Sequence, residues 1–409
     1  MAGSTALPRL IDESTGGART GGVPLSIASR VSHRLGEVEA LWRSLESAGI
    51  ESPGQSYAFT RLWVQTQDIA EEDQFYIVGE VAGAPVALFP LHRKVSKGVR
   101  RLSWFPGHHV GCNAPLIDRA RLAALTSGQR KSLWASMLGG LKGIDVVHLR
   151  AMPETLVDGV DIFAELGTWL QGDTLYRAQF SSWEEANTTQ RSKSRRKHDR
   201  QQGEKLEAMG KVTFEELSDG AVNGGVLDLM FQQRAARFVQ MGVADPFAEA
   251  CIRKFYDATV APGSGIDVRL HALRLNGEIV ALRYNIAHDD RLFCLISSMS
   301  LEPSIQPGSP GKQCLLRVMQ TVFDGGFRIF DMGAGFTDEK RHWCNVQIPV
   351  RHHYLPLTAL GHAASGLHRN WQLGRRRIKE NRHLLAFAKA IRSRLHKARP
   401  SDAKAEADD

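Results

Sequence analysis

The sequence lacks the features that define several broad classes of protein. Its only cysteines are Cys112, Cys251, Cys294, Cys314 and Cys344, and no Cys-x-x-Cys pair occurs. This spacing excludes a disulfide framework and favours reduced thiols. No apolar run is long enough to cross a bilayer. Residues 1–24 are polar and contain no apolar signal core, so we expect a flexible lead and a cytoplasmic protein.

Signatures of several catalytic and binding classes are also missing. There is no Gly-x-Ser-x-Gly elbow of the kind found in many hydrolases. His108-His109 and His352-His353 are adjacent pairs, and neighbours on a strand point to opposite faces, so we expect no metal site. The run 191–200 has six Lys/Arg and one acid, but no aromatic residue follows it until Phe214. We therefore expect no specific nucleic-acid partner; the run either contacts an anionic substrate or forms a solvated helix.

Positive charge is concentrated late in the chain. The net charge is +8, but residues 365–400 carry eleven Lys/Arg against one acid, and residues 401–409 are acidic. Within residues 361–409 we predict a basic amphipathic helix that binds an anionic membrane surface or an acidic protein. Its apolar face would consist of Leu384, Ala388, Ile391 and Leu395. Packing against the body and a polar disordered tail are the alternatives.

The body contains a weak internal repeat. Two strands joined at Gly83 are predicted in the first half, and two joined at Asn276-Gly277, a dipeptide typical of hairpins, in the second. Aligning these turns superposes Val86-Ala87-Leu88 on Val280-Ala281-Leu282. A helix, a glycine and a strand then follow in each half. Either the chain holds two copies of one unit, or two common patterns coincide.

Two copies of one unit account well for the length of 409 residues. We accordingly divide the chain into four parts. They are the lead at 1–24, a first, degenerate unit at 25–178, a second unit at 179–360, and the basic segment with its acidic terminus at 361–409.

A Pro/Gly loop precedes a predicted helix in the second unit. The stretch QPGSPGKQCLL opens at Gln306, and apolar residues then recur at helical spacing until Gly325-Gly326. Glycines admit close approach, and the first turn of a helix presents N–H groups, so the loop predicts a phosphate cradle. It is not a Walker loop, because Gln306 and Gln313 stand at the first Gly and the Ser/Thr positions. The alternative is an ordinary loop that caps a core helix.

The second unit resembles a known group of enzymes. Three strands, the loop, a helix and a further strand follow in the order found in the GNAT acyl-CoA N-acyltransferase superfamily. SPGKQCLL and FDMGAGFTDEKRHW resemble the CelD-type acetyltransferases of cellulose and exopolysaccharide synthesis, and Arg237-Phe238 on an earlier stretch is similar too. The matching positions are Ser309-Pro310-Gly311, Asp331 with Gly333 and Gly335, Lys340 and Trp343. The resemblance covers residues 181–351 and extends to the Fem-type aminoacyltransferases, which carry two such units.

The resemblance implies a fold class and an activity. The fold would be α/β (α+β), with tandem GNAT-like units of mixed, mostly antiparallel sheet flanked by helices. The activity would be transfer from acetyl-CoA or another acyl-CoA to a small amine or amino sugar in surface-polysaccharide synthesis, in the cytoplasm or peripheral to the inner membrane. A Fem-like transferase that uses aminoacyl-tRNA and a non-catalytic scaffold of a polysaccharide synthase are the alternatives.

The resemblance also implies site residues. Acyl transfer to an amine requires a proton acceptor for the amine, a donor for the oxyanion and a proton for the thiolate. Asp331 is the first candidate for the base, Asp338, Glu339 and His342 follow on the next loop, and Tyr284 is the candidate acid. The expected coenzyme contacts are Ser297, Ser298, Met299, Gly308, Ser309, Gly311, Lys312 and Gln313. The expected substrate contacts are Arg237, Lys340 and Trp343.

Each of these assignments has a structural alternative. Asp331 would instead cap a turn or pair with a neighbouring cation. Tyr284 would be a core aromatic, Lys312 a solvated side chain, and Arg237 a partner in a surface ion pair.

Overall fold

The computed structural model of the chain describes residues 25–156, 161–217 and 224–380. The first half supplies β1 (Ile27–Ser32), α1 (Glu39–Glu46), α2 (Tyr57–Thr66), β2 (Gln74–Val81), β3 (Ala84–Ser96), β4 (Val99–Trp104), β5 (Leu116–Ile117), α3 (Arg119–Ala124), α4 (Ser127–Leu138), β6 (Val146–Pro153) and β7 (Thr168–Gln179). The connection to the second half contains α5 (Trp183–Glu185) and α6 (Lys193–Glu207). The second half supplies β8 (Val212–Leu217), α7 (Gly224–Met241), α8 (Ala250–Thr259), β9 (Asp267–Leu275), β10 (Glu278–His288), β11 (Arg291–Met299), α9 (Pro310–Asp324), β12 (Ile329–Ala334), α10 (Asp338–Trp343) and β13 (Val346–Pro356). The last described element is α11 (Ala359–Glu380).

The two halves repeat one order of elements. Each runs strand, two helices, three antiparallel strands, helix, strand, with α1, α2 and α4 in the first half matching α7, α8 and α9 in the second. The third strand of each meander then pairs in parallel with the strand after the helix, β4 with β6 and β11 with β12. A parallel pair needs a crossover connection, and the helix provides it. The topology thus confirms the tandem α/β fold with a mixed sheet.

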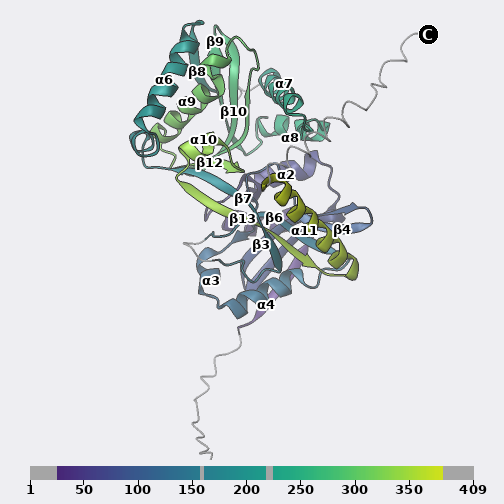
Figure 1. Cartoon of the computed structure of the whole chain (residues 1–409). Helices are drawn as coiled ribbons and strands as arrows, with labels where there is room; N and C mark the ends of the chain where they lie inside the picture. The colour runs from purple at the N-terminus through teal and green to yellow at the C-terminus, as the bar shows by residue number, and fades with distance from the viewer. Residues whose placement is uncertain (1–24, 157–160, 218–223, 381–409) are drawn as a thin grey trace, which may run out of the picture.

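The last strand of each half is exchanged. The strand order is β1-β2-β3-β4-β6-β13-β7-β12-β11-β10-β9-β8. β13, from the second half, therefore pairs with β6 of the first, and β7, from the first half, pairs with β12 of the second. Both strands cross the middle of the molecule in Figure 1. A single continuous sheet joins the halves, so the boundary at 178/179 divides the sequence but not the sheet.

The aligned hairpins have the same turn. Ala82 and Gly83 have φ values of 52° and 76°, and Asn276 and Gly277 have φ values of 54° and 88°. Two consecutive positive φ values define a type I′ turn, which matches the twist of two-residue hairpins. The local repeat seen in the sequence is therefore a real repeat of backbone geometry.

Helices cover both faces of the sheet. On β10, Leu282, Tyr284 and Ile286 pack with α7 and α8 in one cluster, whereas Ala281 and Ala287 pack with α9 in another. Alternate residues of a strand face opposite sides, so α9 and the α7–α8 pair lie on opposite faces. The predicted helix at the Pro/Gly loop is α9, whose apolar residues are buried. In Figure 1, α6 lies beside α9.

The predicted apolar face Leu384, Ala388, Ile391 and Leu395 lies outside the described residues. Within the ranges that the structure describes, no helix is both long and apolar enough to cross a membrane.

Candidate functional site

The parallel strands β11 and β12 separate soon after they pair. They pair only from Arg291 to Phe293 with Ile329 to Asp331. Beyond this point β12 bends away, because its pairing with β7 shifts between Asp331 and Ala334 and Gly333 has a φ of 76°. A bulge of this kind ends pairing and redirects a strand. The result is an opening between the two strands.

A cavity of about 570 Å³ occupies this opening, and we call it the splay cavity. Its wall combines both halves of the chain, since the loop after β4, the strands β7 and β13, and the helices α7 and α10 all contribute. The lining residues used below are Asp173, Arg234, Cys294, Leu295, Ser297, Met332, Gly333, Ala334, Glu339, Lys340 and His352.

The β11 residues predicted to contact the coenzyme have three different environments. Ser297 is exposed and lines the splay cavity. Ser298 is buried, and its hydroxyl donates to Gln233 Oε1 at 2.8 Å. Met299 lies beneath the loop, since a Cβ added to Gly311 would be 2.9 Å from Met299 Sδ. Only Ser297 therefore has a side chain that faces the cavity, whereas Met299 supports the glycine loop.

The loop before α9 has the geometry of a partly open helix terminus. Ser309 is the N-cap residue with a φ of 48°, and its carbonyl accepts from the N–H groups of Lys312 and Gln313 at 2.9 and 3.1 Å. Pro310 has no N–H. Gly311 N–H is therefore the amide of the first turn that remains for a ligand.

Helix α6 covers the remainder of the predicted cradle. A Cβ on Gly308 would lie 2.8 Å from Leu206 Cβ, and the Gln313 side chain is buried and donates to Asp199 O at 2.7 Å. Gly308 therefore packs against α6, and the Gln313 N–H, which the sequence predicts as a phosphate contact, donates to Ser309 O at 3.1 Å. The Ser309 hydroxyl accepts from Gln202 at 2.8 Å.

Lys312 connects the loop to the splay cavity. Its side chain is 37% exposed, and its Nζ lies 3.7 Å from Glu339 Oε1, a cavity carboxylate. Ser309, Gly311 and Lys312 thus form a smaller site than the sequence predicts, linked to the cavity through the ion pair of Lys312 with Glu339. An exposed lysine beside a free helix N–H fits a phosphate group.

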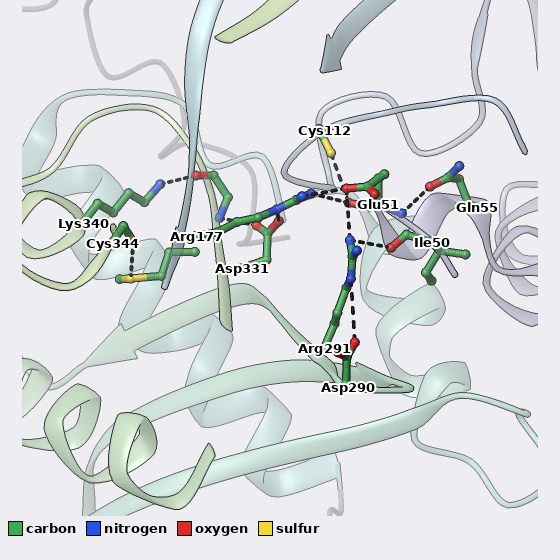
Figure 2. Close-up of polar contacts among 12 residues, drawn as sticks. Ile50, Glu51, Gln55, Cys112, Arg177, Asp290, Arg291, Asp331, Lys340 and Cys344 are labelled. Carbon is green, nitrogen blue, oxygen red and sulfur yellow. Dashed lines mark hydrogen bonds and ion pairs between the residues drawn. The ribbon is translucent and has the colours of Figure 1, made fainter. Parts of the chain in front are cut away.

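Asp331 is held in a buried ion-pair network rather than in the cavity (Figure 2). Its Oδ2 accepts from Arg177 Nε at 2.8 Å, and its Oδ1 accepts from Gly333 N–H at 2.7 Å. Both oxygens are used, and Asp331 does not line the cavity. The prediction that Asp331 is the base is therefore unsupported by its position. It fixes the β12 bulge instead.

The network continues into the first half through Glu51. Glu51 Oε2 accepts from Arg177 Nη1 at 2.6 Å and lies 3.0 Å from Arg291 Nη1, and Glu51 Oε1 accepts from Arg119 at 2.7 Å. Burial by itself would raise the pKa of Glu51, but the three arginines lower it to about 2. Burial by itself would lower the pKa of Arg177, but the negative charges of Asp331 and Glu51 raise it above the ordinary value. The network therefore joins β7, β11 and β12 to the loop after α1 (Figure 2).

Of the other candidate catalytic residues, Glu339 lines the splay cavity, whereas Tyr284, Asp338 and His342 do not. Tyr284 is fully buried, and its hydroxyl shares a hydrogen bond of 2.5 Å with the Thr259 hydroxyl. Asp338 is exposed and pairs with Arg341 at 3.6 Å. His342 does not line the splay cavity. Tyr284 is a core residue because it lies on the β10 face that α7 and α8 cover.

The expected substrate contacts divide in a similar way. Lys340 lines the splay cavity, its Nζ donates to Gly333 O at 3.1 Å and Ala334 O at 2.8 Å, and burial lowers its pKa. Trp343 is buried against Trp183, with ring centroids 6.0 Å apart. Arg237 is exposed and donates to Gln240. Trp343 thus packs in the core and Arg237 faces solvent, and contact of either residue with the substrate stays a prediction.

Three cavity residues were missed by sequence reasoning. Arg234 lies one turn before Arg237 on α7, and its Nη1 donates to Ser297 O at 3.2 Å. Asp173 lies where the β7–β13 register shifts, and His352 is on β13. Arg234 could have been predicted from the sequence, because residues three apart on a helix lie on the same side and Arg237 was already a candidate. The bulge around Asp173 depends on strand exchange, which nothing in the local sequence reveals.

The hydrogen bonding of His352 defines the tautomer of its ring. Its Nδ1 accepts from Ala151 N–H at 3.1 Å, and burial, followed by the nearby Arg150, lowers its pKa to about 4. The ring is therefore neutral at pH 7 and carries its proton on Nε2. A Cβ on Gly172 would lie 2.8 Å from this nitrogen, so the glycine leaves it room.

The fold and the cavity define an α/β protein with two GNAT-like halves. Residues 193–341 match the family model described as "Acetyltransferase (GNAT) domain". The match runs from α6 to α10 and includes both strands of the splay and the loop before α9. The chain thus carries a GNAT acetyltransferase domain and is an N-acyltransferase that uses an acyl-CoA as co-substrate. The match spans fewer than half of the residues, and no curated protein matches the chain.

Solved structures with similar folds share little sequence with this chain. One is the C-terminal domain of a putative lysylphosphatidylglycerol synthetase from Agrobacterium fabrum, with 11% identity, a TM-score of 0.48, and coverage of 82% of this chain and 95% of that chain. FemX has 10% identity, a TM-score of 0.47, and coverage of 74% and 96%. A tandem GNAT protein from the clavulanic acid biosynthesis pathway has 10% identity, a TM-score of 0.39, and coverage of 82% and 99%.

Proposed function

We propose that the chain transfers an acyl group, in the first instance acetyl, from coenzyme A to an amine in the splay cavity. The observation that carries the proposal is the cavity itself, which opens between the parallel strands of the domain that matches the acetyltransferase model. A bound acyl-CoA supplies the activated thioester. The residues of the chain bind the coenzyme, orient the amine and accept its proton.

Coenzyme binding rests on the loop before α9. Gly311 N–H and the Lys312 ammonium offer hydrogen bonds to phosphate oxygens. The edge of β11 from Cys294 to Met299 has no strand partner on the β12 side in the described sheet. Backbone N–H groups on this free edge can stabilise an oxyanion, because they are fixed before the reaction begins.

Asp173 is the proposed proton acceptor. It is exposed, lines the splay cavity and sits in the bulge of β7 opposite β13. The other cavity carboxylate, Glu339, is already paired with Arg195 at 3.2 Å and with Lys312. A carboxylate without an ion-pair partner in the described chain binds the acceptor's ammonium group and then takes a proton from it.

A panel of acyl-CoAs and amines tests the proposal through release of free thiol. Asp173→Asn should lower kcat by about 10²-fold or more, since general base catalysis contributes at least this much. Coenzyme affinity should stay unchanged. Asp68→Asn, an exposed Asp in a loop, serves as the matched control. Thiol release by Asp173→Asn at the normal rate would contradict the assignment, and no release with any acyl-CoA would contradict the function.

For the acceptor we propose an amino sugar or similar small amine in surface-polysaccharide synthesis, at or near the inner membrane. The CelD-type resemblance of the SPGKQCLL and FDMGAGFTDEKRHW segments supports this, as does the basic composition of residues 365–400. Loss of acylated surface polysaccharide in a deletion strain, restored by the wild-type chain but not by Asp173→Asn, is the expected outcome.

A Fem-like transfer from aminoacyl-tRNA is the second candidate. A groove of about 840 Å³ between α6 and α9 favours it, because Lys193, Arg196, Lys197 and Arg200 line it. Parallel assays with labelled acyl-CoA and aminoacyl-tRNA separate the two donors. Transfer from the tRNA alone would select the second candidate.

A further inference from the structure

The first half contains a second splay at the equivalent place. β4 pairs in parallel with β6 only at Arg101 and Leu102, and the strands then separate. A cavity of about 690 Å³ lies beyond this pairing, and we call it the arginine cavity. β7 and β13 line it as well, and α11, which crosses this face in Figure 1, contributes residues to its wall.

The arginine cavity has an excess of positive charge. Arg101, Arg150, Arg375 and Arg376 line it, and Asp173 is its only carboxylate among the described residues. In the same part of the chain, neither Arg101 nor Arg150 forms an ion pair or a side-chain hydrogen bond with another residue. Arginines that line a cavity without an ion-pair partner are complementary to an anionic ligand.

Two buried nitrogens in the wall also lack partners. Trp104 is 3% exposed, and its Nε1 has no hydrogen-bond acceptor among the described residues. His148 Nε2 is likewise buried and unpartnered, while its ring stacks on Tyr354 at 4.6 Å. Burial, followed by His368 and Arg101, keeps the pKa of His148 well below its usual value. Buried polar atoms are normally satisfied, so these two nitrogens in the cavity wall are available to hydrogen-bond a ligand.

The arginine cavity is not a second coenzyme site. At the start of α4, the equivalent of α9, Thr126 and Gln129 form a capping box, in which Gln129 N–H donates to the Thr126 hydroxyl and Thr126 N–H donates to the Gln129 side chain. Gly128 takes the second helical position of α4, as Gly311 does in α9, but Gln129 stands where α9 has Lys312, and the two residues between α3 and α4, Leu125 and Thr126, include no Pro or Gly. The first half has thus kept the splay and lost the phosphate-binding helix terminus.

The two cavities are adjacent and have wall residues in common. They share the lining residues Gly107, His108, Arg150, Asp173 and His352. Asp173 and His352 therefore stand at the junction. A ligand anchored in the arginine cavity can extend past them into the splay cavity, where acyl transfer is proposed.

We propose that the arginine cavity is the acceptor site, and that it binds an amine whose other end carries an oxyanion, either a phosphate or a carboxylate. This proposal rests on the proposed function. Arg101 and Arg150 bind the anion, Trp104 Nε1 donates a further hydrogen bond, and the amine lies at Asp173. The second half then binds the acyl donor at its splay, and the first half binds the amine acceptor at the equivalent splay.

Anion binding by the full chain, saturated with desulfo-CoA, tests the proposal by calorimetry. The probes are inorganic phosphate, pyrophosphate and citrate, and saturation with desulfo-CoA blocks the loop before α9. Arg101→Ala should weaken binding of the preferred probe by about tenfold or more, as expected for a charge-assisted hydrogen bond. His148→Phe keeps the stack on Tyr354 and should weaken binding less. Arg121→Ala, an exposed arginine on α3, is the control and should bind normally.

Preference for pyrophosphate or phosphate would assign a phosphate-bearing acceptor, and preference for citrate a carboxylate-bearing one. Failure of all three probes to bind in the millimolar range would overturn the proposal. It would also be overturned if Arg101→Ala weakened desulfo-CoA binding instead, because the cavity would then belong to the donor. Normal anion binding without thiol release from any acyl-CoA would leave this site intact and reject only the proposed function.

Discussion

At the scale of single residues, Glu51 and Arg177 organise the site without touching the cavity. Glu51 accepts from Arg177 and Arg119 and pairs with Arg291, and Arg177 also holds Asp331. Removing one member of a buried pair leaves an uncompensated charge, which costs about 3–5 kcal/mol. Glu51→Gln should therefore lower the free energy of unfolding by about this amount in denaturant titrations. Glu71→Gln is the control, because Glu71 forms an exposed ion pair with Arg34. It should change the free energy of unfolding by less than about 1 kcal/mol.

The same network predicts a dependence on acid. The folded pKa of Glu51 is lowered to about 2, below the value of an unfolded Glu near 4.5. Its contribution is therefore fully present above pH 4.5 and is lost as the pH falls toward 2. The difference in Tm between the wild type and Glu51→Gln should shrink over this interval. A constant difference from pH 6 to pH 2 would show that the charge of Glu51 is not what stabilises the network.

Arg234 and Arg237 allow a matched comparison on one helix. Arg234 lines the splay cavity, donates to Ser297 O and stacks on Phe238 at 4.5 Å, whereas Arg237 is exposed. Arg234→Ala should lower kcat/KM for acyl transfer by about tenfold or more. Arg237→Ala should retain the wild-type value. If Arg237→Ala lowered kcat/KM and Arg234→Ala did not, the result would support the substrate contact that the sequence predicts for Arg237.

Residue types were easier to predict from the sequence than residue environments. Lys340 and Ser297 do lie in the cavity, and both come from segments with a recognisable motif or strand pattern. Asp331 also comes from a motif, but its partner Arg177 is 154 residues away in the chain, and Glu51, which Arg177 also binds, is a further 126 residues from Arg177. Local sequence carries no signal for contacts of that range. The role of Asp331 therefore required the structure.

At the scale of elements, the start of α9 is the feature on which coenzyme binding depends. Glutamate at position 311 would place a negative charge beside the N–H group and the lysine proposed for the phosphates. Met299 is the neighbour a side chain would meet, and its flexible thioether can move. Gly311→Glu should therefore fold and weaken acyl-CoA binding by about tenfold or more.

Gln320→Glu is the matched control, since it adds the same charge to an exposed position of α9. It should bind acyl-CoA normally in calorimetry. If both variants bind normally, the loop before α9 does not hold the coenzyme.

The order of elements in the second half was predictable, and their packing was not. The strands of the meander, the helix α9 and the strand β12 all follow from periodicity and turn residues such as Asn276-Gly277. The basic run before Phe214 was predicted as a helix, but its position over Gly308 and Gln313 was not. That position depends on Gly203, which has no side chain and lets α6 approach Gln313, and on Leu206, which lies against Gly308. Neither residue is distinctive in the sequence.

At the scale of the whole molecule, the exchanged strands make each half depend on the other. β12 has β7 as its neighbour on the side away from β11, so a second half expressed alone would expose a buried strand edge. A fragment of residues 181–380 should therefore aggregate or melt without a cooperative transition. The full chain is the control. A soluble fragment with a sharp thermal transition would contradict this dependence.

The repeat itself was visible in the sequence because both hairpins turn at a glycine with similar flanking residues. The exchange was not visible, because β7 and β13 look like ordinary strands and their partners are set by the sheet as a whole. Asp173 and His352 come from these two strands. The junction between the cavities is thus a product of the complete fold.

A crystal structure of the chain with a non-hydrolysable acyl-CoA analogue tests the central claim most directly. The account predicts phosphates at Gly311 and Lys312, and the thioester position between Ser297 of β11 and Gly333 of β12. An analogue bound in the arginine cavity, or on a surface away from both splays, would contradict it.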